Sequence, residues 1–311
     1  MPPAVPIDTL EPNRARILGS FAAIYIIWGS TFLAIRWGVE TIPPFLMMTG
    51  RCFLGGAVLV ALALVQSRGT PRPTLKELGG AAVAGTCFFV GCHGLLAYAE
   101  QTVPSGMAAL CLATIPLFVP LLVWGSSLGG PPTLRATGAL LVGFAGVAML
   151  VASQGSGGGL AATDAALLLF TALSWAVGTV ATRVLPMPAS PAMSGGAALL
   201  AGALLLLPIS AAAGEFGEFS AADVSAKSLG GLLYLVVAGT VLTFSSYMWL
   251  LTHVEPARVA TYAFVNPAVA VLLGWAIADE GLTAGALAAT VVIIAAVAVV
   301  VTERRPALAT E

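Results

Sequence analysis

The sequence predicts an all-α integral membrane protein in which ten transmembrane helices form two inverted five-helix repeats. Its composition is the first observation behind this fold class: 59% of the 311 residues are hydrophobic and only 9% are charged. Soluble domains carry about 25% charged residues. A surface that contacts water cannot be built from so few charged side chains, so we expect the chain to lie in a lipid bilayer.

A near-repetition of the sequence is the second observation. The segment Trp28–Arg36 resembles the segment Trp175–Arg183, 147 residues later, with both the Trp and the Arg in register. A second alignment, at a shift of 151 residues, places Pro116 opposite Pro267. Two apolar halves with prolines at matching depths are typical of a transporter built around a central site.

The number of apolar segments is the third observation. A helix that spans the bilayer needs about 20 predominantly apolar residues, and the segments of this kind are separated by Pro-rich and Gly-rich breaks. In chain order the predicted spans cover residues 17–36, 44–66, 78–99, 104–125, 134–152, 163–184, 190–211, 228–251, 257–277 and 282–301.

The domain organisation follows from these spans and from the glycine-rich loop 155–159. We expect a cytoplasmic N-terminal tail (1–16), a first five-helix repeat (17–154), a second, inverted repeat (160–302) and a cytoplasmic C-terminal tail (303–311). The first tail has no apolar core of the kind found in signal peptides. The longest connections, 66–77 and 212–227, are too short for a soluble domain.

Basic residues predict the orientation, because Lys and Arg accumulate on the cytoplasmic side. With the N-terminus inside, Arg36 and Lys227 face outward and Arg51 lies within the second span. Ten of the 13 basic residues then fall inside: Arg14, Arg16, Arg68, Arg72, Lys76, Arg135, Arg183, Arg258, Arg304 and Arg305. We therefore expect the protein in the inner membrane, with both termini in the cytoplasm. Five spans per repeat is an odd number, so the second repeat is inverted.

The net charge and the cysteine positions argue against a nucleic-acid-binding or zinc-binding protein. A net charge of −1 without a basic cluster disfavours nucleic-acid binding, which needs grouped Lys and Arg. The four cysteines, Cys52, Cys87, Cys92 and Cys111, lie within apolar segments and match no zinc-binding spacing. The sequence thus predicts no metal site, no cofactor and no catalytic residue.

Polar side chains inside the spans indicate where a cavity lies, because such groups are costly unless they face the bundle interior or water. Trp28 and Thr31 share one face of the first span, and Trp175 and Thr179 share the matching face of the sixth. The third, fourth, eighth and ninth spans add further candidates. The predicted substrate-binding residues are Trp28, Thr31, His93, Tyr98, Thr114, Trp175, Thr179, Tyr247, Tyr262 and Asn266.

Two prolines and two titratable residues have more open interpretations. Pro116 and Pro267 fall near the middle of predicted spans, where each removes a backbone hydrogen bond, so we expect them to act as hinges or gates. His93 could bind a carboxylate, relay a proton or form a hydrogen bond within the bundle. Arg51 is expected either to extend to the membrane interface or to pair with Glu40 or Glu100.

Several motifs resemble one known family over nearly the whole chain. They are Trp28-Gly-Ser-Thr-Phe, Arg51, Ala97-Tyr-Ala, the Pro116 segment and Glu280-Gly-Leu-Thr283, and they are similar to the EamA-type branch of the drug/metabolite transporter superfamily. The resemblance is greatest to bacterial exporters of amino acids, including the aromatic amino acid group. It implies a central cavity lined by helices 1, 3, 4, 6, 8 and 9 that works by alternating access.

The chain departs from this family at two acidic positions. The acidic residue that usually follows the fourth helix is missing from residues 125–130, and only Glu280 matches the one after the ninth, for which we expect a structural role. The small multidrug exporters of the superfamily bind protons at a glutamate in their first helix. No acidic residue lies between Leu18 and Ile35, so that mechanism cannot be transferred.

The predicted function is export of amino acids, including hydrophobic and aromatic ones, and of related small metabolites. A carrier of phosphorylated solutes such as sugar phosphates is an alternative that requires fixed cations at mid-depth. A membrane enzyme would need several titratable groups at one depth, and a scaffold that does not transport is a third alternative. The expected partners are a small-molecule substrate and the lipid bilayer, and both a monomer and a homodimer are compatible with the sequence.

Overall fold

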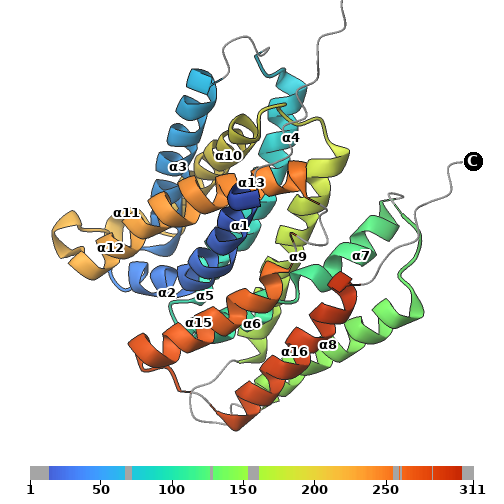
Figure 1. The fold of residues 1–311 in the computed structure, drawn as a ribbon. Helices are drawn as coiled ribbons and strands as arrows, with labels where there is room; N and C mark the ends of the chain where they lie inside the picture. Colours follow the sequence, from blue (N-terminus) through green and yellow to red (C-terminus); the bar gives the residue numbers. More distant parts are fainter. Residues whose placement is uncertain are drawn as a thin grey trace, which may run out of the picture.

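The architecture confirms that the fold is all-helical, with apolar helices long enough to cross a membrane. The computed structural model describes residues 14–66, 72–126, 129–152, 161–254, 259, 261–281 and 283–302. Within these ranges every regular element is a helix, and no strand is found (Figure 1). Seven helices are long and apolar enough to cross a membrane, and three further apolar helices are shorter. The predicted loop 155–159, the tail 303–311, Arg68 and Arg258 lie outside the described residues.

The first half of the chain forms five helical stretches. Three of them are composed of shorter pieces, with π-helical pieces labelled η. In chain order they are α1 (Arg14–Ala22), η1 (Ala23–Ile27) and α2 (Trp28–Gly38); α3 (Pro44–Gln66); α4 (Leu75–Gly85), η2 (Thr86–Gly94) and α5 (Leu95–Ala99); α6 (Ser105–Leu112) and α7 (Ile115–Gly125); and α8 (Leu134–Ala152).

The second half is also helical throughout its described residues. Its elements are α9 (Ala162–Val184), α10 (Pro191–Ala212), α11 (Glu215–Glu218), the short 3-10 helix η3 (Ala221–Asp223), α12 (Ala226–Tyr234), the π-helix η4 (Leu235–Leu242), α13 (Thr243–His253), α15 (Tyr262–Ala278) and α16 (Ala284–Thr302). Elements α12, η4 and α13 form one nearly continuous rod, as the α1, η1, α2 and α4, η2, α5 series do.

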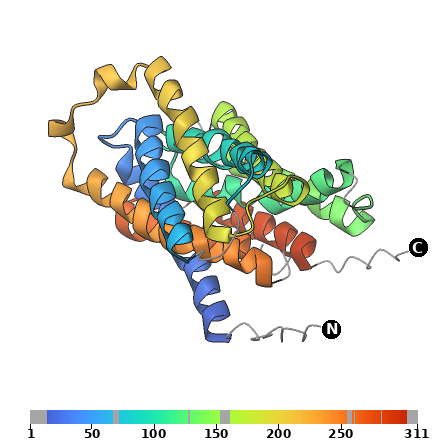
Figure 2. The same ribbon diagram turned by 90° about the horizontal axis from the view of Figure 1, so that it is seen from above.

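Close packing joins the two halves. Helices α3 and α10 lie side by side (Figure 2), and a Cβ atom on Gly196 of α10 would lie only 2.9 Å from the backbone nitrogen of Val60 of α3. Helices α8 and α16 form another pair, in which a Cβ on Gly146 would lie 2.8 Å from Cγ1 of Ile293. Glycine permits both approaches because small residues let helix backbones come together in membranes.

The π-helices are a feature that the apolar pattern did not predict. In a π-helix the backbone hydrogen bonds join residues five apart. Two side chains in these helices also bond to the carbonyl five residues earlier. The His93 ring nitrogen Nδ1 lies 2.9 Å from the Phe88 carbonyl, and the Thr240 hydroxyl donates to the Leu235 carbonyl at 2.9 Å. The π-turns therefore shift the helix face within three long rods, and one of them, η2, carries the cavity residues Cys92 and His93.

The fourth helical stretch breaks where the sequence predicted a continuous helix. Helix α6 ends at Leu112, and α7 begins at Ile115, so Pro116 is the second residue of a helix and not its middle. Proline is favourable there because a helix start has no intrahelical partner for the missing N–H. Pro267, in contrast, lies inside α15 as expected.

Candidate substrate cavity

One cavity lies between α2, η2, α5, α6, α9 and α15. It contains about 550 Å³ of empty space, including the open space at its mouth. Seven of the twelve residues predicted as binding or hinge positions lie in its wall: Trp28, Thr31, His93, Trp175, Tyr262, Asn266 and Pro267. Residues from both halves of the chain thus surround one space.

Aromatic rings form one side of this cavity. Trp28 is at the centre of an aromatic cluster that we define as Trp28, Trp175, Tyr247 and Tyr262. Its ring centroid lies 5.9 Å from that of Trp175, 5.0 Å from that of Tyr247 and 5.4 Å from that of Tyr262. The Trp28 indole N–H also donates to the Gly239 carbonyl at 3.0 Å, which fixes its orientation. The aromatic cluster therefore joins four spans around one indole.

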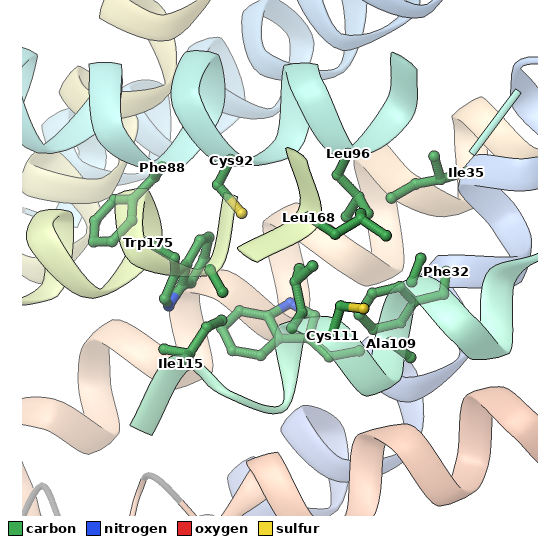
Figure 3. Packing of buried hydrophobic residues seen from close by; sticks show 14 of the residues in the cluster. Phe32, Ile35, Phe88, Cys92, Leu96, Ala109, Cys111, Ile115, Leu168 and Trp175 are labelled. Atoms are coloured by element: carbon green, nitrogen blue, oxygen red, sulfur yellow. The ribbon is translucent and has the colours of Figure 1, made fainter. Parts of the chain in front are cut away.

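Apolar side chains form the rest of the wall. Figure 3 shows Phe88 and Trp175 at one end of this packing, and Phe32, Ile35 and Leu96 at the other. The Phe88 and Trp175 ring centroids are 4.6 Å apart, and the other three side chains line the cavity. Such a surface suits the apolar part of a small ligand.

The Trp175 indole N–H lies near two tyrosine hydroxyls without a well-formed hydrogen bond to either. Trp175 is 4% exposed and lines the cavity, and its side chain interacts with the hydroxyls of Tyr247 and Tyr262. Its Nε1 nevertheless has no acceptor at hydrogen-bond distance and angle among the described residues. A buried N–H without a partner is costly, because it has lost its bonds to water. This indole can therefore donate to an acceptor atom of a bound molecule.

His93 and Asn266 each use one polar atom internally. The bond between His93 Nδ1 and the Phe88 carbonyl requires a proton on Nδ1, so Nε2 of the neutral ring is an acceptor. The Asn266 amide nitrogen lies within 2.9 Å of the Ile24 carbonyl and 3.1 Å of the Tyr25 carbonyl, both in π-helix η1, and donates to them. One acceptor on each residue stays available to the cavity.

Pro267 acts on a carbonyl at the cavity wall. Proline has no N–H for the carbonyl four residues earlier, which for Pro267 belongs to Ala263 of the same helix, and Ala263 lines the cavity. Pro116 follows the break after Leu112 and lies at the start of α7, so it removes no hydrogen bond from a continuous helix. The two aligned prolines therefore differ in their effect on the helices that contain them.

The remaining predicted residues lie outside the cavity wall. Tyr98 is 51% exposed and stacks on Phe45, with ring centroids 6.0 Å apart. Thr114 is fully buried and donates to the Cys111 carbonyl at 2.6 Å. Thr179 donates to the Trp175 carbonyl at 3.0 Å. Tyr247 supports Trp28 from the aromatic cluster, and Pro116 is buried at the start of α7.

Arg51 differs from both sequence expectations. It is 2% exposed, so it does not extend to the interface, and Glu40 pairs instead with Lys227 at 2.6 Å. Arg51 Nε donates to the Thr240 hydroxyl at 3.0 Å, and Nη1 lies 3.9 Å from the Met48 sulfur. The guanidinium also interacts electrostatically with His93 and Cys92 of the cavity wall. A buried cation therefore lies directly behind the cavity.

The sequence predicted Arg51 either at the membrane interface or paired with Glu40 or Glu100. The signal that could have identified it is its position inside the second span, because an arginine far from a helix end faces the protein interior or a wet cavity. The spacing alone did not show which neighbouring helix would receive it.

An all-helical bundle of membrane-crossing helices around an aromatic, partly polar cavity defines a multi-pass membrane protein of the transporter class. The sequence profile of the EamA-like transporter family matches residues 17–152 and 164–302. The chain therefore belongs to this family, within the drug/metabolite transporter superfamily, and the resemblance stated from its motifs is confirmed.

Relatives with similar sequences extend over most of the chain. The uncharacterized inner membrane transporter YedA of Escherichia coli K12 is 38% identical over 274 residues, which cover 86% of this chain and 84% of YedA. Protein PecM of Dickeya dadantii is 27% identical over 282 residues, covering 88% of each chain. A solved crystal structure covers 92% of this chain and 96% of its own, with a TM-score of 0.64 and 20% identity, and so supports the fold.

Proposed function

We propose that this protein exports neutral amino acids, including aromatic and hydrophobic ones, and related small metabolites across the inner membrane. Transport proceeds by alternating access between two inverted five-helix repeats, 17–154 and 160–302, with both termini in the cytoplasm. The observation that carries the proposal is the aromatic cluster around Trp28, which is built from spans of both repeats and borders one cavity.

The helix inventory supports the two-repeat arrangement. Seven long and three shorter apolar helices equal the number of spans required, and the same family profile matches once in each half. Trp28 and Trp175, which align between the halves, contact each other. Two repeats that rock around a shared midplane site need this symmetry.

The chemistry of the wall supports a zwitterion with an apolar side chain. Phe32, Ile35 and Leu96 can hold the apolar part. The Trp175 indole N–H can donate to a carboxylate, whereas the acceptors on His93 and Asn266 and the Ala263 carbonyl released by Pro267 can bind an ammonium group. Arg51, behind the wall, adds a positive potential that favours the carboxylate.

The cavity chemistry favours this substrate class over the alternatives. Recognition of a phosphate group is strongest when cations bind its oxygens directly, but among the described residues the wall contains neither Lys nor Arg. Enzymatic catalysis would require several titratable groups that converge on one point. In the described part of the chain the titratable side chains of the cavity wall are Cys92, His93 and Tyr262, without a carboxylate among them.

Counterflow in liposomes tests the proposal. Purified protein in liposomes preloaded with unlabelled L-phenylalanine should take up radiolabelled L-phenylalanine with saturable kinetics, and L-leucine should compete. Empty liposomes and liposomes containing the Trp28→Ala variant are the controls. Absence of saturable exchange for phenylalanine, leucine and other neutral amino acids, with correctly folded protein, would overturn the proposal.

A further inference from the structure

Glu100 has a buried carboxyl group without a hydrogen-bond partner. It follows the last residue of α5 and is 0% exposed, and neither Oε1 nor Oε2 has a hydrogen-bond partner in the described ranges. An isolated carboxylate without water is very unfavourable, so such a group takes up a proton or acquires a compensating charge. The proposed cavity does not use this residue, because Glu100 is not in its wall.

Arg36 and Glu280 are the charged neighbours of Glu100. The Arg36 guanidinium, near the end of α2, donates to the backbone carbonyl of Glu100 and not to its carboxyl group. Glu280, between α15 and α16, interacts with Glu100 electrostatically. Burial and the like charge of Glu280 raise the pKa of Glu100 well above its usual range, and Arg36 opposes this shift.

Glu280 has the partners that Glu100 lacks. Its carboxylate accepts bonds from the Ser105 amide at 2.8 Å, the Ser105 hydroxyl at 2.7 Å and the Gly106 amide at 3.0 Å, at the N-terminus of α6. This position favours the ionised carboxylate because helix N-termini carry a partial positive charge. Gly274 leaves room for the group, since a Cβ there would lie 2.3 Å from Oε2 of Glu280.

The three side chains form a cluster that is electrically neutral only with one extra proton. Arg36 contributes one positive charge and Glu280 one negative charge, so a proton on Glu100 makes the sum zero. Other charged groups nearby are satisfied elsewhere: Asp279 is exposed, and Lys227 pairs with Glu40 at 2.6 Å. The cluster of Arg36, Glu100 and Glu280 is called the charge cluster below.

The charge cluster lies directly next to the cavity wall. Ile35 lines the cavity and Arg36 is the next residue of α2. Leu96 also lines it, and the Glu100 amide donates to the Leu96 carbonyl at 2.9 Å, one helical turn away. Glu280 is in the wall of a second hollow, of about 360 Å³ with its open mouth included, bordered by α6, α15 and α16. Because the Arg36 side chain bonds to the Glu100 backbone, we expect a movement of α2 at the cavity to shift Arg36 relative to Glu100.

We propose that Glu100 is a proton-binding site that couples transport to a proton gradient, an inference that rests on the proposed function. In the state described here Glu100 holds the proton. When the cavity opens to the other side of the membrane and α2 moves, the Arg36 guanidinium leaves the backbone carbonyl of Glu100. It then binds the carboxyl group of Glu100. The O–H bond breaks, the proton passes to water in the hollow next to Glu280, and the carboxylate that forms pairs with Arg36.

Infrared titration tests the proton site without any transport assay. Purified wild-type protein at neutral pH should show the carbonyl band of a protonated carboxylic acid, and this band should be absent from Glu100→Gln. The matched control is Glu215→Gln, because the Glu215 carboxylate accepts bonds from the Phe45 and Leu46 amides and the Ser210 hydroxyl. That control should retain the band. A band of equal intensity in wild type and Glu100→Gln, or no band in wild type, would contradict the proposal.

Proteoliposomes test the coupling. A pH gradient should drive accumulation of radiolabelled L-phenylalanine in wild type, and Glu100→Gln should lose this accumulation while it still exchanges labelled for unlabelled phenylalanine. Glu100→Asp retains a titratable group and should retain part of the accumulation. Exchange without any response to pH, or accumulation driven only by a sodium gradient, would overturn the coupling. Absence of all exchange in wild type would instead refute the proposed function and leave the infrared test to decide the proton site.

Discussion

Trp28 and Trp175 lie edge to face, with ring centroids 5.9 Å apart and ring planes at 89°, although they belong to opposite halves of the chain. This geometry is favourable because the positive edge of one ring meets the negative face of the other. The contact places two residues that align in the sequence repeat at one cavity wall. Disturbing it should affect transport more than membrane insertion.

Replacing Trp28 by Ala should lower the rate of amino acid exchange about tenfold or more, because three ring contacts of roughly 0.5–1.5 kcal/mol each are lost. Radiolabel exchange in proteoliposomes measures the effect, at protein amounts matched by gel filtration. The control is Trp124→Ala, since Trp124 is 53% exposed and lies outside the cavity wall. Equal rates for Trp28→Ala and wild type would show that the aromatic cluster is not part of the site.

Replacing Arg51 by Met should leave thermal stability unchanged or increase it, while it weakens substrate binding. The buried guanidinium has lost its hydration, and its hydrogen-bond partners among the described residues are the Thr240 hydroxyl and the Met48 sulfur, so its desolvation is poorly compensated. Thermal unfolding in detergent and the concentration dependence of exchange measure the two effects. A strong loss of stability with unchanged exchange kinetics would assign Arg51 a purely structural role.

Replacing Glu280 by Ala should destabilise the protein by about 1.5–3 kcal/mol for each charge-assisted bond that is not replaced by water. The reason is that three donors at the start of α6 lose their common acceptor. Thermal unfolding measures this change, with Glu218→Ala as the control because Glu218 is exposed. An unfolding temperature equal to that of wild type would show that water replaces the carboxylate fully.

Replacing Gly274 by Ala should destabilise the same contact, since the new Cβ would displace the Glu280 carboxylate. The matched control is Gly138→Ala in α8, where a Cβ meets nothing within 4 Å. In a helix interior that change should be neutral or stabilise by about 0.5–1 kcal/mol. If both variants unfold at the same temperature, α15 adjusts to the added methyl group. In the double variant Gly274→Ala with Glu280→Ala, the two losses should not add.

The stability of the wild type should decrease as pH rises above the ordinary pKa range of a glutamate. The pKa of Glu100 is higher in the folded than in the unfolded chain, so the folded state binds more protons in this interval and loses that advantage as pH increases. Thermal unfolding over a pH series should show this slope in wild type and a smaller slope in Glu100→Gln. Identical slopes would mean that Glu100 does not titrate between the two states.

The membrane class, the family and most residues near the cavity could be predicted from the sequence. The predicted range 44–66 agrees with α3, and 163–184 lies within one residue of α9. These agreements follow from the length of apolar runs, which governs partition into hydrocarbon residue by residue. The alignment of Trp28 with Trp175 similarly indicated a shared site before any distance was known.

The roles of individual polar side chains were harder to predict. Tyr98 and Tyr262 lie in similar apolar surroundings in the sequence, yet Tyr98 is largely exposed and Tyr262 lines the cavity. Arg51 was expected near the interface and is buried, and the π-helix that receives its bond to Thr240 was not expected. A change of one residue in helical phase rotates a side chain by about 100°, and π-turns introduce such changes.

The sequence by itself determined that this is an integral membrane protein, that it belongs to the EamA-like transporters and that its halves resemble each other. Those properties depend on composition, run length and local motifs, which are readable along the chain. Only the tertiary structure decided that Arg51 lies behind the cavity, that Glu280 binds the start of α6 and that Glu100 is left without a partner. Such properties depend on which helices meet and at what rotation, and packing between distant segments sets both.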